Sequence, residues 1–379
     1  MLHSFFHPPK HRGTPSEATQ FPQDVSLLDL PWKVSYANAH RFRMTALLYT
    51  KNTGSEGPDR ARESRRWSWL ITVLKVGLSV LAFAIVALTV DLSAAWERAA
   101  NQSIPYIILS AAILSVQLLL AGLRWHAILA RLGTKPSLRD SIGLYYISAF
   151  FNAYLWGAVG GDVLRAWLTY RRQLSAKVAV NSVVLDRIAA IAGVALLVLA
   201  TAPIFFARVG NSLPMYIPLG FACAGLAGII VAANLRRIPA AWLGSRLARY
   251  LQSLGGSVQQ ILLTPKAALP VLGFAIAAQI ALGVATFSMA ASLGMKVTML
   301  DCIVLMQPVA LLASLPISVG GWGVRETAVV LLFGLIGVPS SAALVLSLQL
   351  GLLALLVVLP GGILWLLLQI KERAPRPPA

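Results

Sequence analysis

The sequence predicts an all-α polytopic membrane protein with about seven full spans and two interrupted or re-entrant segments, which are related by an inverted internal repeat. Of its 379 residues, 57% are apolar and only 12% are charged, and the mean hydropathy is +0.73. A soluble domain carries about 25% charged residues. Because a membrane span needs about 20 predominantly apolar residues, the long apolar runs of this chain predict helices that cross a bilayer.

Residues 1–66 differ from the rest of the chain, since they are rich in Pro, His, Ser and charged residues and show no sustained apolar periodicity. Segments that cannot bury enough apolar surface stay disordered, so we predict a disordered, basic cytoplasmic tail. No apolar run follows the N-terminus, which argues against a signal peptide. Whether Met44 is the true start is left open. Residues 67–371 are predicted to form the transmembrane domain and 372–379 a short cytoplasmic tail.

The apolar segments follow one another with short loops between them. In order, they are 68–90, 104–123, 142–161, 178–207, 214–233, 268–292, 302–321, 326–338 and 342–370. The segments 142–161 and 302–321 each end at a Gly-Gly pair and are predicted to be interrupted. The loop 234–264 interleaves apolar residues with Arg and Ser, which predicts an amphipathic helix on the cytoplasmic surface.

Lys and Arg fix the predicted orientation, because cytoplasmic loops of membrane proteins carry an excess of both. The basic stretches are 124–141, 162–177, 234–267 and the tail after 370, whereas 91–103, 208–213 and 293–300 are poor in Lys and Arg. Both termini are therefore predicted in the cytoplasm. The same distribution accounts for the net charge of +18 without nucleic acid as a partner, and it favours contact with anionic lipid headgroups.

Basic loops lie on both sides of the segment 142–161, although a simple span would place one of them outside. We therefore predict that this segment enters from the cytoplasm, turns within the membrane and returns. Such backbone is tolerated where protein or water covers it. By the same count, 302–321 is approached from the outer side. The two segments would then have opposite orientations, as in the inverted repeats of many transporters.

The two interrupted segments share a motif. Residues 153–166 and 313–326 match at six of fourteen positions. Interrupted apolar segments at corresponding places in two halves point to a transporter's binding site. The matched residues at the breaks are Gly160, Gly161 and Arg165 in the first copy and Gly320, Gly321 and Arg325 in the second.

The first Gly-Gly pair predicts a turn, with Asp162 as the N-cap of a following helix and Arg165 in its first turn. A cation there is disfavoured by the helix dipole, by about 0.3–1 kcal/mol. The same unfavourable placement of an Arg at Arg325 is explained if an anion binds, because free N–H groups and a guanidinium would then converge on a phosphate. Alternatively, Arg165 pairs with Asp162, three residues away on the same helix face, and Arg325 with another buried acid. Both interpretations remain open.

Other polar residues lie inside apolar runs. Adjacent helical residues do not face each other, so Glu326 is expected to interact with a group other than Arg325, either an Arg of the first half or a coupling proton. Asp186 and Arg187 are candidates for a functional site because ionisable residues are costly within a membrane; an interhelical ion pair is the alternative. Asn152 is expected to bond backbone groups freed at the first break.

Enzyme chemistry is not expected. Outside the tail the sequence has one histidine, His126, and beyond residue 66 only eight acidic residues. We find no metal-ligand spacing, no Gly-rich phosphate loop before a Lys and no nucleophile paired with a base. We therefore predict a protein that is not an enzyme and that has no cofactor.

Several motifs together resemble a known family. They are Phe151-Asn152, Gly160 to Arg165, Ser182 to Arg187 and Leu315 to Glu326, in this order. This arrangement is similar to the flippase-like transmembrane domain of bacterial lysylphosphatidylglycerol synthases and its stand-alone relatives, over about residues 70–370. The family pattern has a Pro near Trp156, from which this chain departs, and often a Glu at Asp186. The second copy keeps its Pro at Pro316.

The resemblance implies an inner-membrane protein that moves an anionic lipid, or a lipid-linked precursor, between leaflets. It also implies the stand-alone form, without an aminoacyltransferase domain. The alternative is an accessory protein of cell-envelope glycan or lipid synthesis, which binds lipid-linked intermediates beside a partner enzyme and moves nothing. A third possibility is a membrane transferase. The oligomeric state is left open. The predicted substrate-binding residues are Gly160, Gly161, Asp162, Arg165, Asp186, Arg187, Gly320, Gly321, Gly323, Arg325 and Glu326.

Overall fold

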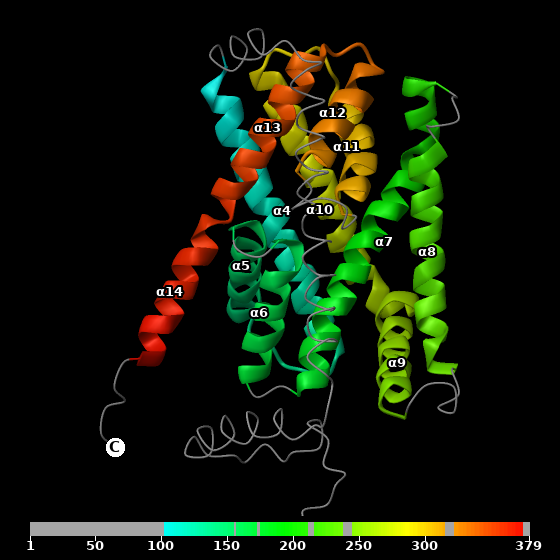
Figure 1. Ribbon diagram of the computed structural model, residues 1–379, viewed down its shortest axis with the longest axis vertical. Helices are drawn as coiled ribbons and strands as arrows, with labels where there is room; N and C mark the ends of the chain where they lie inside the picture. Colours follow the sequence, from blue (N-terminus) through cyan, green and yellow to red (C-terminus); the bar gives the residue numbers. More distant parts are fainter. Residues whose placement is uncertain are drawn as a thin grey trace, which may run out of the picture. The chain divides into compact units, whose positions relative to one another are not determined.

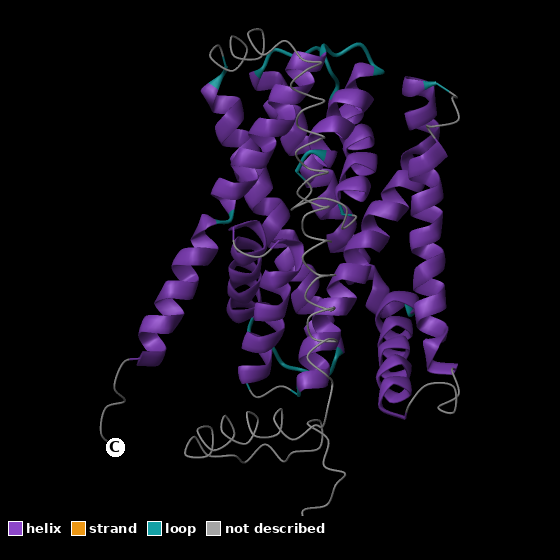
Figure 2. Ribbon diagram, in the orientation of Figure 1, coloured by secondary structure: helices purple, strands orange, loops and turns teal. Residues whose placement is uncertain are grey.

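The computed structural model describes residues 102–154, 157–172, 175–210, 216–237, 245–314 and 322–373. Every regular element within these ranges is helical (Figures 1 and 2), which confirms the all-α class. The predicted tail 1–66 and the predicted first span 68–90 lie outside the described residues, as does most of the predicted C-terminal tail.

Five of the described stretches are long and apolar enough to cross a membrane, so the chain is a multi-pass membrane protein. They are α4 (Ile104–Arg131), α7 (Ala176–Val209), α8 (Ile217–Asn234) with the short η3 (Leu235–Arg237), α10 (Pro265–Ser292), and α13 (Ser340–Val357) with α14 (Leu359–Arg373) to Gln369. The predicted segment 342–370 is therefore divided at Val358, where Pro360 follows and supplies no backbone N–H. The count of seven full spans stays a prediction.

Helices α4 and α10 form an antiparallel pair with extensive contact. The Ser103 backbone N–H, at the start of α4, donates to the Ser292 carbonyl at the end of α10, with a distance of 3.2 Å. Two turns into α4, the Ser110 hydroxyl donates to the Ala285 carbonyl at 2.9 Å. Small side chains and serine hydroxyls let membrane helices approach closely and bond across the interface.

Helices α5 (Leu138–Tyr154) and α6 (Gly157–Arg171) pack side by side as a hairpin in the lower half of the view (Figure 1). The chain thus turns back on itself near the predicted place. However, Gly160 and Gly161 lie inside α6, so the prediction that the chain breaks at this Gly-Gly pair is wrong. The prediction that Asp162 caps the helix and that Arg165 lies in the first turn is wrong for the same reason, because α6 begins at Gly157.

Helices α11 (Met299–Ala313) and α12 (Val324–Gly334) contact each other in the upper half of the same view (Figure 1). Helix α11 begins with a capping box, in which Thr298 and Asp301 each bond the other's backbone N–H. At 1.5 Å per residue, α11 and α12 are about 22 and 16 Å long. Each is shorter than the ~30 Å hydrocarbon core, so neither crosses a membrane alone.

The two halves correspond in more than the Gly-Gly motif. Helices α4 and α10 both contain 28 residues. Each is followed by a shorter helix, and Leu138 follows Ile104 by the same number of positions as Met299 follows Pro265. The two short hairpins lie toward opposite ends of the view (Figure 1). These correspondences agree with the inverted repeat, which stays a prediction.

The basic ends of α4 and α6 and the end of α8, where the basic turn η3 follows, lie at the lower end of the view, where α9 (Ser245–Val258) also lies (Figure 1). A helix was predicted in the loop 234–264, and α9 confirms it. It continues into a π-helical turn, η5 (Gln259–Leu263), and packs on α8. No side chain fits at Gly255, because a Cβ there would lie 2.8 Å from the carbonyl oxygen of Ala232.

The apolar core is divided between two main regions. The larger cluster joins α10, α11, α12 and α13 and contains Met289, Leu305, Phe333 and Leu346. A second joins α4, α7, α8, α9, η5 and α10. Between α4, α5 and α6, a smaller cluster around Trp125 and Ile147 fixes the hairpin beside the polar residues described next.

Candidate functional site

Five charged side chains from α4, α6 and α7 meet within the described helices. Arg124 lies on α4, Asp162 and Arg165 on α6, and Asp186 and Arg187 on α7. We call them the first charge cluster. Arg124, Asp162, Arg165 and Asp186 are buried, whereas the Arg187 side chain is 51% exposed. Four of the five were predicted as site residues.

Asp186 lies at the centre of the cluster and bridges two guanidinium groups. Its Oδ1 accepts a bond from Arg124 Nε at 2.8 Å, and its Oδ2 accepts one from Arg165 Nη2 at 3.0 Å. Asp186 follows Ser182 by one helical turn, and the Ser182 hydroxyl accepts a bond from the Trp125 indole at 3.3 Å. One face of α7 is therefore held against α4 by polar contacts, which confirms the interhelical ion pair predicted as the alternative for Asp186.

Asp162 accepts bonds from four side chains on three helices. Its Oδ1 lies 3.1 Å from Arg165 Nη2, 3.3 Å from Ser148 Oγ and 3.4 Å from Asn152 Nδ2. Its Oδ2 accepts a bond from Arg187 Nε. The pairing of Arg165 with Asp162 is thus observed. Two guanidinium groups, a hydroxyl and an amide around one oxyanion form a set of donors that also suits a phosphate.

The Arg165 side chain is only 1% exposed, and its guanidinium lies between two aromatic rings. Its central carbon is 4.9 Å from the Trp125 ring centre and 4.8 Å from that of Tyr145. Cation–π contacts of this kind hold a desolvated guanidinium in place. Among the described residues, its Nε and Nη1 have no hydrogen-bond partner, so two buried nitrogens with three N–H groups remain for a ligand or for water.

Gly161 allows α5 and α6 to approach closely. Its backbone N–H donates to the Asn152 side-chain carbonyl at 2.8 Å, which is the contact predicted for Asn152. A Cβ at Gly161 would overlap the Ser148 carbonyl oxygen. The glycine is therefore required for helix packing rather than for a turn, and this packing brings Ser148 and Asn152 to Asp162.

Replacing Gly161 by Ala is expected to destabilise the hairpin, because the added methyl group would push α6 away from the α5 backbone. We expect a loss of about 1–3 kcal/mol, the usual cost of overpacking. Gly143→Ala in α5 is the matched control, since nothing lies within 4 Å of its Cβ position and Ala favours the helix. Thermal unfolding of the purified variants should show a lowered midpoint for Gly161→Ala alone; equal midpoints would contradict this role.

A second charge cluster lies at the start of α12 and comprises Trp322, Gly323, Arg325, Glu326 and, from α13, Ser347. Glu326 is fully buried. Its Oε2 accepts the Gly323 backbone N–H at 2.6 Å, and its Oε1 accepts Arg325 Nε at 3.0 Å and lies 3.5 Å from the Ser347 hydroxyl. Gly323 has a φ of +85°, a conformation that favours glycine.

Arg325 and Glu326 pair directly, so the expectation that adjacent residues would not meet is wrong. In the first turn of a helix, a Glu side chain folds back to cap the free N–H groups, and here Arg325 reaches the same carboxylate. The Arg325 guanidinium also lies 4.6 Å from the Trp322 ring centre. A Cβ at Gly351 would overlap it, so this glycine of α13 makes room for the guanidinium. Gly320 and Gly321 lie outside the described residues.

The two clusters have one spacing in common. Asp186 follows its partner Arg165 by 21 positions, and Ser347 follows Glu326 by the same number. In both, a short helix presents a charged side chain to the long helix that comes after it in the chain. The charges differ, because α6 presents the cation of Arg165 to a carboxylate, whereas α12 presents the carboxylate of Glu326 to the neutral hydroxyl of Ser347.

The sequence profile of the lysylphosphatidylglycerol synthase TM region matches residues 72–362. This chain belongs to that family. The match covers more than half of the chain and includes both charge clusters. Family membership connects the protein with lipid-related functions in membranes. A search of curated proteins finds no match.

In this member of the lysylphosphatidylglycerol synthase TM family, several residues of the two charge clusters were not predicted from the sequence. Arg124 was assigned to a basic loop, but α4 continues to Arg131 and buries it. Its position directly after the apolar run 104–123, next to Trp125, could have indicated a buried partner. Ser148, seven residues after Ser141 on one face of α5, carried a weaker signal, and Ser347 carried none.

Proposed function

We propose that this protein translocates an anionic lipid, or a lipid-linked precursor, between the leaflets of the bacterial inner membrane, with both termini in the cytoplasm. One observation carries the proposal. In each charge cluster, a short helix of a hairpin, α6 of α5–α6 or α12 of α11–α12, places a charged side chain against a neighbouring long helix. Broken or half-length helices that carry polar groups to membrane depth are the usual construction of transporter binding sites.

The physical problem for such a protein is the charged headgroup. A charge in hydrocarbon costs several kcal/mol, and a protein lowers this cost by offering compensating charges along the way. In the first cluster Arg187 is the most exposed guanidinium, and in the second Arg325 is 22% exposed. We propose that these two contact the headgroup phosphate. Arg165, which is buried and bonded to two carboxylates, holds the first cluster in shape.

Asp162 suggests how a phosphate would be exchanged. It already accepts a bond from Arg187, so a lipid phosphate that reaches Arg187 competes with this carboxylate for the same guanidinium. The competition keeps binding reversible, because Asp162 takes the donor back when the lipid leaves. A transporter requires this, since a site that binds too tightly does not release its substrate.

We propose that the protein is not an enzyme and that its partners are phospholipids or lipid-linked glycan precursors. No ATP-binding motif was found in the sequence, so movement would run downhill or be driven by an ion gradient. An envelope-synthesis enzyme is the proposed protein partner if the lipid is a precursor.

Lipid scrambling in proteoliposomes tests the proposal. Purified protein is reconstituted with fluorescent phosphatidylglycerol, and accessibility to an outside quencher is followed. We expect Arg187→Gln and Arg325→Gln each to slow translocation at least about tenfold, because each removes a charge-assisted phosphate contact, and 1.4 kcal/mol corresponds to a factor of ten. Arg171→Gln, which also removes one exposed arginine, is the matched control and should translocate at the wild-type rate.

Two outcomes would count against the proposal. If wild-type protein moves neither anionic phospholipids nor a lipid-linked glycan precursor, the accessory role becomes the better interpretation. If all three variants translocate equally, the two clusters are structural. Co-purification of the inactive protein with a glycosyltransferase would then support the accessory role directly.

A further inference from the structure

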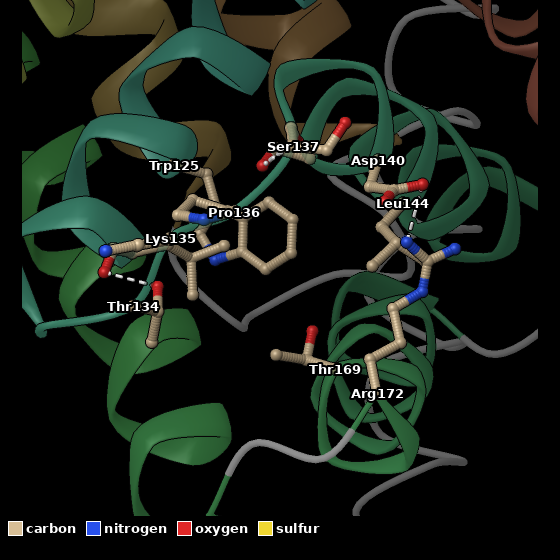
Figure 3. A pocket seen from close by; sticks show the side chains of 11 residues that line it. Trp125, Thr134, Lys135, Pro136, Ser137, Asp140, Leu144, Thr169 and Arg172 are labelled. Carbon is tan, nitrogen blue, oxygen red and sulfur yellow. Dashed lines mark hydrogen bonds and ion pairs between the residues drawn. The ribbon is translucent and has the colours of Figure 1, made fainter.

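A pocket of about 170 Å³ opens at the lower end of the α5–α6 hairpin (Figure 3), and its lining includes none of the charged residues of the two clusters. It lies where α4 ends, α5 begins and α6 ends. Its volume equals the liquid volume of about five or six waters, at ~30 Å³ each, which is enough for the five heavy atoms of a phosphate group. The lining includes Trp125, Thr134, Lys135, Pro136, Ser137, Asp140, Leu144, Thr169 and Arg172.

The lining has donors at its rim and apolar groups behind them. Lys135 and Arg172 are exposed cations, and Figure 3 shows them on opposite sides of the space. Arg172 Nη1 pairs with Asp140 Oδ1 at 2.6 Å, and a guanidinium has further N–H donors to offer. Among the described residues, no carboxylate lies within ion-pair distance of Lys135. Cations around a space of this size suit an anion, because Asp140 is already engaged.

The apolar part of the lining suits the remainder of a lipid. Leu129, Leu144 and Pro136 contribute carbon surface beside the polar rim. The pocket also lies at the end of α4, a helix long and apolar enough to cross a membrane, and so at the level where headgroups lie. Polar groups on one side and apolar walls on the other match a headgroup at a membrane interface.

Two lining residues of this pocket contact the first charge cluster. Trp125 lines the pocket, and the Arg165 guanidinium lies over its ring. Thr169, also in the lining, bonds through its hydroxyl to the Arg165 carbonyl at 2.7 Å. Trp125 and Thr169 therefore connect the pocket lining with Arg165 of the first charge cluster.

We propose that this pocket binds a phosphate group through Lys135 and Arg172, as the docking site where a headgroup is held before it reaches the first charge cluster. The docking role of the pocket rests on the proposed function, whereas the binding of a phosphate group can be tested without it. The phosphate can belong to a lipid headgroup or be free in solution, and the experiment separates these sources.

The test is a calorimetric titration of the purified full chain in neutral maltoside detergent. The probes are dihexanoyl phosphatidylglycerol and inorganic phosphate. We expect saturable binding of the lipid, and a Kd raised at least about tenfold by Lys135→Gln and by Arg172→Gln, because each removes a charged donor. Arg171→Gln, the neighbouring exposed arginine outside the lining, should change the Kd less than about twofold.

The titration distinguishes the two sources of the phosphate. Competition by inorganic phosphate at similar affinity identifies a free-anion site, whereas weak competition identifies the lipid headgroup. The proposal fails if neither probe saturates, or if Arg171→Gln weakens binding as much as the other two. Should Arg172→Gln lower the unfolding midpoint by loss of its Asp140 pair, Lys135→Gln decides alone. If the lipid binds saturably but the protein does not scramble lipids, the proposed translocation is contradicted and the proposed phosphate site is not. If Lys135→Gln and Arg172→Gln leave scrambling unchanged, the proposed docking role of the pocket is contradicted.

Discussion

Asp186→Asn is expected to lower the free energy of unfolding by about 3–5 kcal/mol, the cost of removing one partner from a buried ion pair. Asp186 is the carboxylate that Arg124 and Arg165 share, and the side chains of all three are at most 5% exposed. Asn keeps the shape but not the charge, so both guanidinium groups lose an ionic partner where water cannot replace it. Equilibrium unfolding in mixed micelles measures the change.

The Arg172–Asp140 pair provides the control for this prediction. Its side chains are 37% and 52% exposed, and exposed pairs contribute about 0–1 kcal/mol. Asp140→Asn removes the same carboxylate charge and is expected to have a correspondingly small effect. Comparable losses in the two variants would mean that the first charge cluster is solvated and that its burial does not determine its energy.

Glu326→Ala is expected to cost about 3 kcal/mol, since it removes the acceptor of the Gly323 backbone N–H and the ionic partner of Arg325 in one change. The fully buried position of Glu326 raises the cost, whereas the partial exposure of Arg325 lowers it. Glu326→Gln retains a carbonyl oxygen toward Gly323, so its loss should be about half as large.

The pair of Glu326 variants separates two roles. If Glu326→Gln and Glu326→Ala are equally destabilising, the charge opposite Arg325 determines the loss of unfolding free energy, and the bond to the Gly323 N–H contributes little. If Gln matches the wild type, the cap alone is important. The same unfolding measurement in mixed micelles distinguishes these results, and Ser347→Ala should change it by no more than about 1 kcal/mol, because its bond to Glu326 is long, at 3.5 Å.

Apolar run length predicted the long helices well. The predicted spans 104–123, 178–207, 214–233 and 268–292 correspond to α4, α7, α8 and α10, because burying apolar surface in a membrane requires a continuous run that composition reveals. The charge of the neighbouring loops also predicted that the chain turns back after α5. These are properties of single segments, and no knowledge of a neighbour is needed to see them.

Partner choice could not be predicted in the same way. Gly161 was assigned to a turn, although its role is a close approach to Ser148 in another helix. Arg124 was assigned to a loop, although Asp186, far along the chain, draws it into the interior. In both cases the deciding contact is tertiary, and a local pattern contains no information about which residue lies opposite.

The separation of the two charge clusters has a consequence for biosynthesis. Helix α4 cannot pack against α10, its antiparallel partner, until α10 has been synthesised. At a translation rate of 5–20 residues per second, this delay is on the order of ten seconds. The ionic contacts described for the first cluster come from α4 to α7, and those of the second from α12 and α13. Each set of charges can therefore be neutralised as its own half emerges from the ribosome, so that the nascent chain need not hold unpaired ions in lipid until synthesis is complete.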